Sequence, residues 1–263
     1  MNTPTDVTAL FQAAEEDGAL SQTTMSALNV TDLTTQIQAA LGVSVDDVPA
    51  SEVVLVTMMP DDSGSIRFAG NAQIVRDGHN LVLKALQASK QKDGILAHTR
   101  YLNGHVLFPY CFIDQAVPMD TKNYDPHRGT PLYDQTVSLL ATVLVKSQEF
   151  ADSGVPARTV TLIITDGADE SSTKATARTV ASLVQDMLRA ETHIIAAMGI
   201  HDGATDFRKV FREMGIPDQW ILTPGNSAAE IRRAFQAFSQ SAVRASQSAA
   251  QFGQAALGGF GTP

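Results

Sequence analysis

Cysteine, tryptophan and positive charge are scarce in this chain of 263 residues. A single cysteine, Cys111, excludes an intramolecular disulfide framework, and we expect it to be buried and unreactive. The 19 lysines and arginines are outnumbered by 28 aspartates and glutamates, which gives a formal charge of −9. Binding to nucleic acid irrespective of sequence requires a basic surface. We therefore expect no nucleic-acid partner.

Long apolar runs are also missing. No stretch approaches the roughly 20 apolar residues that cross a bilayer, and residues 1–6 lack the basic and apolar regions of a signal peptide. We expect no membrane partner and a cytoplasmic location. The chain has no glycine-rich dinucleotide fingerprint after its first strand, no Walker loop and no Gly-x-Ser-x-Gly. Its six histidines show no spacing typical of zinc ligands or a catalytic dyad, so we expect no enzymatic activity.

What is present is an alternation of apolar, strand-like runs with stretches of helical periodicity between about residues 49 and 240. At 44% hydrophobic residues the chain can bury a substantial core. We predict strands at 53–59, 95–102, 105–112, 159–165, 193–199 and 219–223. We predict helices at 72–89, 131–150, 173–190, 206–214 and 226–245. This order predicts an α/β fold with a doubly wound, Rossmann-like, mostly parallel sheet.

Three local patterns refine this prediction. Asn103-Gly104 is the residue pair best suited to a tight primed turn, so residues 95–112 should form a hairpin whose second strand is an antiparallel edge. Residues 1–48 predict a small helical N-terminal extension, with Gly18 and Gly42 as helix stops. Residues 241–263 predict the end of the last helix and a flexible, glycine-rich tail.

Polar motifs lie at the expected carboxyl ends of strands, where ligands bind on sheets of this kind. An Asp-x-Ser-x-Ser motif follows the first apolar run, an Asp-Gly pair follows the strand at 159–165, and a Thr-Pro-Leu-Tyr-Asp motif opens the helix between them. The candidate ligands are Asp61, Ser63, Ser65, Thr130 and Asp166. Together they offer an all-oxygen pocket suited to a hard divalent cation.

This arrangement resembles the metal-ion-dependent adhesion site of von Willebrand factor type A (vWA) domains over roughly residues 49–240. The resemblance implies a bound Mg²⁺ or Mn²⁺. Ser63 and Ser65 would be direct ligands, Thr130 would bind directly or through water, and Asp61 and Asp166 would act mainly through coordinated water. It also implies a cation-dependent protein-binding module, for adhesion or assembly, whose ion captures an Asp or Glu carboxylate of a protein partner.

Two weaker features resemble a particular group. The run from Arg128 to Tyr133 and the serine-rich segment from Phe238 to Ser241 are similar to stand-alone bacterial vWA proteins associated with tellurium resistance and stress. That likeness implies a role in the bacterial stress response. The oligomeric state is left open.

Other interpretations of the same motifs exist. Thr130 before Pro131 could simply cap the following helix, and the acidic residues Asp169 and Glu170 favour a solvated rim over cation ligands. A metal-dependent hydrolase would need a base near the ion, and His127 is the one candidate close to Thr130 in sequence. A third possibility is a structural vWA domain whose site stays empty.

Overall fold

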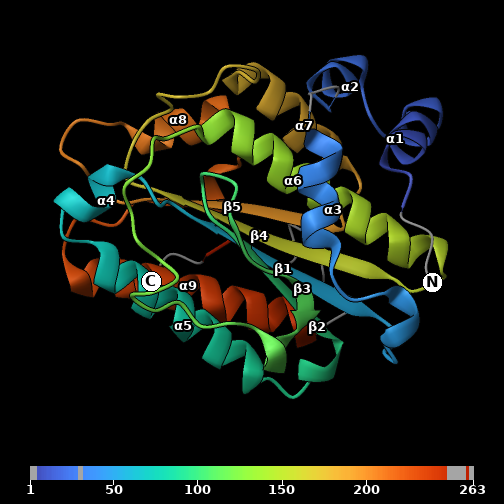
Figure 1. Cartoon of the computed structure of the whole chain (residues 1–263), viewed down its shortest axis with the longest axis horizontal. Coiled ribbons are helices and arrows are strands. Elements are labelled where there is room, and N and C mark those ends of the chain that lie inside the picture. The colour runs from blue at the N-terminus through green and yellow to red at the C-terminus, as the bar shows by residue number, and fades with distance from the viewer. Residues whose placement is uncertain (1–4, 29–31, 248–258, 261–263) are drawn as a thin grey trace.

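A six-stranded sheet forms the centre of the protein, in the order β3-β2-β1-β4-β5-β6 (Figure 1). The computed structural model describes residues 5–28, 32–247 and 259–260. The strands are β1 (Val53–Pro60), β2 (Ile95–Arg100), β3 (Val106–Phe112), β4 (Ala157–Thr165), β5 (His193–Gly199) and β6 (Ile221–Leu222). All neighbouring strands are parallel except β2 and β3. The predicted mostly parallel sheet with one antiparallel edge strand is confirmed.

Helices cover both faces of this sheet, as right-handed crossovers between parallel strands require (Figure 1). They are α4 (Gly64–Phe68), α5 (Ala72–Gln87), α6 (Leu132–Asp152), α7 (Ala177–Arg189), α8 (Phe207–Glu213) and α9 (Ala228–Gln247). The helices α5 and α9 pack together on one face, and α6 and α7 lie on the other. Close approach of α5 to α9 depends on Gly78, because a Cβ there would lie 2.1 Å from Cδ2 of Phe235. Within the described ranges, no helix combines the length and the apolarity needed to cross a membrane.

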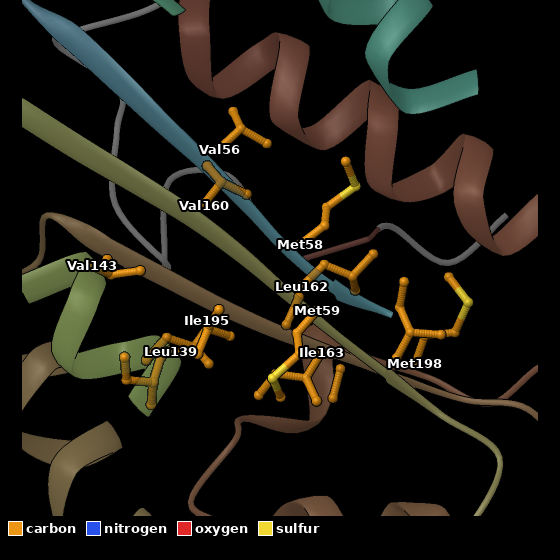
Figure 2. Close-up of a cluster of buried hydrophobic side chains, with 14 of the residues drawn as sticks. Val56, Met58, Met59, Leu139, Val143, Val160, Leu162, Ile163, Ile195 and Met198 are labelled. Atoms are coloured by element: carbon orange, nitrogen blue, oxygen red, sulfur yellow. The ribbon is translucent and has the colours of Figure 1, made fainter. Parts of the chain in front are cut away.

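The core lies on both sides of the central strands. Figure 2 shows aliphatic and methionine side chains from β1, β4, β5 and α6 gathered around the sheet. Each of β1 and β5 is buried at every residue. Strands buried on both faces have continuous apolar sequences, which is why these runs could be recognised from sequence.

The N-terminal extension consists of short helices packed against the main domain. They are α1 (Val7–Glu16), α2 (Gln22–Leu28) and α3 (Leu33–Leu41). The helix α3 contacts α6 and β3 and ends at Gly42, whose φ is +61°. The buried Lys146 of α6 donates a hydrogen bond to the carbonyl of Val43 at 2.5 Å. The extension is therefore part of the packed structure.

Two local predictions are wrong. Asn103 and Gly104 do not form a primed turn, because Gly104 has a positive φ (+87°) and Asn103 does not. The turn has three residues, with the Tyr101 amide donating to His105 O at 2.8 Å and the Gly104 amide donating to Tyr101 O at 2.8 Å. The helix expected from residue 173 begins at Ala177, since the chain before it is held by Asp134.

The predicted flexible tail does not hold for Phe260. Its ring centroid lies 5.2 Å from that of Trp220 and 6.5 Å from that of Phe238. The Phe260 amide also donates to the Gln219 carbonyl at 3.1 Å. The helix α9 extends to Gln247, and residues 248–258 and 261–263 lie outside the described residues.

Candidate functional site

The first and third motifs meet because of the register between β1 and β4. Pro60 and Ile164 are paired in the parallel ladder, so the residues that follow leave the sheet side by side. Asp61 directly follows β1, and Asp166 directly follows Thr165, the last residue of β4. The pairing thus brings two distant carboxylates to one edge of the sheet.

Asp61 fixes the loop that follows β1. Its carboxylate accepts hydrogen bonds from the Ser63 amide and from the Thr165 hydroxyl, each at 2.7 Å. The Tyr124 hydroxyl donates to the Asp61 carbonyl. The Asp61 side chain is fully buried. It ties the loop to β4 and determines where the two serine side chains lie.

Three oxygen atoms form a continuous chain beside Asp61. The hydroxyls of Ser63 and Ser65 are 2.8 Å apart, and the Ser65 hydroxyl donates to Asp166 Oδ1 at 2.5 Å. Ser63 and Asp166 are 2% and 3% exposed, whereas Ser65 is an exposed residue. The cluster is therefore buried on the sheet side and open to solvent at Ser65.

Thr130 enters the same region from the loop before α6. A Cβ built on Gly167 would lie 3.9 Å from the Thr130 hydroxyl and 4.0 Å from its methyl group, so the Thr130 side chain lies beside the third motif. The Thr130 carbonyl accepts from the amides of Glu170 and Ser171 at 3.1 and 3.2 Å. The residue that precedes α6 is Pro131, which makes no side-chain cap. The Thr130 hydroxyl does not cap the helix and has no hydrogen bond to any residue that the structure describes.

The start of α6 is instead held by residues that follow the third motif. The Tyr133 amide donates to Asp169 Oδ1 and to the Ser172 hydroxyl, both at 3.1 Å. Asp134, from the second motif, accepts the amides of Thr173 and Ala175 at 2.9 and 2.6 Å. Asp169 was expected to be a solvated rim charge, and this expectation misses its capping role. These bonds position Thr130 relative to Asp166.

Asp62 has a structural role that the spacing of the sequence motifs does not indicate. Its Oδ1 accepts from the Asn103 backbone amide at 3.0 Å and from Asn103 Nδ2 at 2.9 Å. Its carbonyl accepts from the amides of His127 and Arg128 at 2.9 and 3.1 Å. The position of Asn103 just after β2 could have indicated this contact, because the carboxyl ends of neighbouring parallel strands lie at the same edge of the sheet. Asp62 joins the β1 loop to two neighbouring loops.

The surroundings of the site disfavour the ionised forms of Asp61 and Asp166. Burial raises the pKa of Asp166 to about 6, with further contributions from the negative charges of Asp61 and Asp202. Burial also raises the pKa of Asp61, although its hydrogen bonds to Ser63 and Thr165 oppose this. No described lysine, arginine or histidine forms an ion pair with either residue.

The geometry gives little support to a hydrolase with His127 as its base or to a metal site made of His, Cys, Asp and Glu side chains. His127 is exposed, and its Nδ1 lies 2.5 Å from the Asp125 carbonyl oxygen and 3.6 Å from the Asp125 carboxylate. In the described part of the chain, no three His, Cys, Asp or Glu side chains are grouped to hold a metal ion. A cation at this edge would therefore depend on hydroxyl ligands. Cys111 is only partly buried, contrary to expectation, and burial raises its pKa to about 11.

No family model and no curated protein matches the sequence. Among solved structures, the chain is similar to the pilus adhesin SpaC from Lactobacillus rhamnosus GG, with a TM-score of 0.53 and 13% identity over 73% of this chain. It spans 30% of that adhesin. It is also similar to a von Willebrand factor type A protein from Catenulispora acidiphila, with a TM-score of 0.45 and 17% identity over 74% of this chain and 43% of that one. A third similar structure is the SpRpn10 VWA domain, with a TM-score of 0.48 and 9% identity over 71% of this chain and 94% of that domain. At these identities, the likeness to SpaC shows a shared fold alone.

Proposed function

We propose that the chain is a vWA-type protein-binding module that uses a divalent cation, Mg²⁺ or Mn²⁺, to capture an acidic side chain of a protein partner. The observation that carries the proposal is the chain of oxygens from Ser63 through Ser65 to Asp166. Thr130 adds a hydroxyl without a described hydrogen-bond partner. Hydroxyl ligands with nearby carboxylates suit Mg²⁺, which prefers oxygen ligands and retains several waters.

The electrostatics support the same proposal. Asp61 and Asp166 are two buried carboxylates that lack a positively charged partner among the described residues. A buried charge is costly unless it is paired or near a metal ion. A divalent cation would supply the missing positive charge. Because its direct protein ligands would be mainly neutral hydroxyls, the ion would keep enough charge to attract a partner's carboxylate.

Three further parts of the hypothesis are the biological role, the location and the lack of enzymatic activity. A role in bacterial stress or tellurium resistance depends on the run from Arg128 to Tyr133 and on the serine-rich segment from Phe238 to Ser241, and it remains a prediction. The same holds for a cytoplasmic location and for the expected lack of enzymatic activity. The SpaC structure belongs to an adhesin, which is consistent with binding another protein.

Calorimetric titration of chelator-treated protein with Mg²⁺ and Mn²⁺ tests the proposal. Thr130→Val keeps the shape of the side chain and removes only the hydroxyl, so we expect weaker cation binding without loss of the fold. Thr136→Val is the matched control, because Thr136 is a buried α6 threonine whose hydroxyl has no hydrogen-bond partner in the described part of the chain. We expect its affinity for the cation to equal that of the wild type. Equal cation binding by Thr130→Val and the wild type would contradict the role of Thr130, and no binding by the wild type would favour a structural domain.

A further inference from the structure

Among the large apolar side chains that the structure describes, only two are exposed, and the others are buried or partly buried. Phe68 is 89% exposed and Val117 is 39% exposed. Isolated apolar residues on a surface need no special explanation. The position of Phe68 singles it out, because it ends α4, the short helix that contains Ser65.

Phe68 lies beside the opening of the candidate cation site. Ser65 and Phe68 are three residues apart in α4, and residues at this spacing share one face of a helix. A Cβ built on Gly64 would lie 3.5 Å from Cε2 of Phe68, which places the ring against the backbone between the two serines. The exposed ring therefore lies next to the segment that carries Ser63 and Ser65, two of the candidate ligands.

The remainder of α4 is firmly attached, so Phe68 is held at the surface by its surroundings. Ile66 is fully buried and anchors the helix in the core. The Gly64 amide donates to the Arg128 carbonyl at 3.0 Å, and Arg67 forms an ion pair with Asp125 at 2.7 Å. An exposed phenylalanine forgoes the stabilisation that burial would give. Binding of a partner at this edge would recover it.

We propose that Phe68 is a second contact for the protein partner and determines its specificity. The partner would be a polypeptide segment in which an Asp or Glu lies within a few residues of a large apolar side chain. The carboxylate would bind the cation, and the apolar side chain would pack on the Phe68 ring. This inference rests on the proposed function, since the cation site fixes where the carboxylate lies. A membrane is a poorer candidate, because a single exposed aromatic residue on a chain of charge −9 offers little to anionic lipid.

Selection from a displayed library of random peptides tests the proposal, using the full chain with excess Mg²⁺. We expect enriched peptides to combine an acidic residue with a nearby Leu, Ile, Met, Phe or Trp. Phe68→Ser should lower the affinity for these peptides by about 10- to 100-fold, the range expected when a buried aromatic contact is lost. Its Mg²⁺ affinity should be unchanged. Val117→Ser is the matched control, since it removes the other exposed apolar side chain, and it should bind the peptides like the wild type.

Different failures have different meanings. Enriched acidic peptides without an apolar preference, or with unchanged affinity for Phe68→Ser, would overturn the role of Phe68 and leave the cation proposal intact. Peptides that bind equally in chelator but lose affinity with Phe68→Ser would overturn cation capture and support Phe68 as a contact. A wild-type selection that enriches nothing would count against both. Co-sedimentation with phosphatidylcholine–phosphatidylserine vesicles that is lost in Phe68→Ser would reject a polypeptide partner in favour of a membrane.

Discussion

Replacing Asp166 by asparagine should stabilise the metal-free protein at neutral pH, although it alters the candidate site. Asp166 is 3% exposed, and burial raises its pKa from 3.8 to about 6. A tenfold change in acid dissociation is worth about 1.4 kcal/mol. The ionised carboxylate therefore costs the folded, metal-free protein about 3 kcal/mol above pH 7. Asparagine is neutral at every pH, and its Oδ1 can still accept the Ser65 hydroxyl.

The sign of the pH dependence follows from the raised pKa. Between pH 3.8 and about 6 the folded protein binds more protons at Asp166 than the unfolded chain does. Stability from this group is thus present at low pH and lost as the pH rises through about 6. The advantage of Asp166→Asn over the wild type should increase by up to about 3 kcal/mol between pH 4 and pH 7. Other titrating groups contribute to both proteins and largely cancel in the difference.

Urea unfolding in chelator at several pH values measures this difference. Adding Mg²⁺ should stabilise the wild type and have less effect on Asp166→Asn, because the variant lacks the charge that the cation would neutralise. Asp77→Asn is a suitable control, since Asp77 is an exposed carboxylate on α5 and is not one of the candidate cation ligands. The reasoning is refuted if the asparagine variant is less stable than the wild type in chelator above pH 7, or if the difference does not change with pH.

Three further predictions concern other parts of the structure. Burial lowers the pKa of His79 to about 4, so the stability that this group contributes above pH 6.5 is lost as the pH falls towards 4. In urea unfolding, His79→Gln should therefore lose about 2 kcal/mol less stability between pH 7 and pH 5 than the wild type does. Gly78→Ala should lower the free energy of unfolding by about 1–3 kcal/mol because its Cβ would overlap Phe235, and Phe235→Leu in the same chain should recover part of this loss. Phe260→Ser should lower the melting temperature and increase the fluorescence response of Trp220 to added quencher, and an unchanged response would contradict the packing between the two rings.

The fold could be predicted from sequence because its central strands are buried on both faces. The continuous apolar runs of β1 and β5 are distinctive, and the turn-rich segments between elements separate them from helices. The errors occur where a distant side chain decides the local structure. The backbone amide and the side-chain amide of Asn103 both donate hydrogen bonds to Asp62. The turn that contains Asn103 differs from the one that an Asn-Gly pair favours. The carboxylate of Asp134 likewise holds residues 173–175 outside α7.

The candidate site was only partly visible in the sequence. Spacing identified Asp61, Ser63 and Ser65 as a group, and strand order placed Asp166 beside them. The sequence could not reveal that the Thr130 hydroxyl has no hydrogen-bond partner among the described residues, because a threonine before a proline is also a common helix cap. That distinction depends on Asp169 and Ser172, which occupy the start of α6 instead.

Two features that a bound cation and a bound partner would stabilise lie at the same edge of the sheet. One is the pair of buried carboxylates Asp61 and Asp166, and the other is the exposed ring of Phe68. A cation would relieve the first, and an apolar contact from the partner would relieve the second. If one partner segment contacts both, its carboxylate and the cation stabilise each other, and thermodynamic linkage requires the coupling to be reciprocal. Mg²⁺ should then increase the affinity for an acidic peptide by the same factor by which the peptide increases the affinity for Mg²⁺. A factor of one in both titrations would mean that the peptide and the ion do not stabilise each other at this edge.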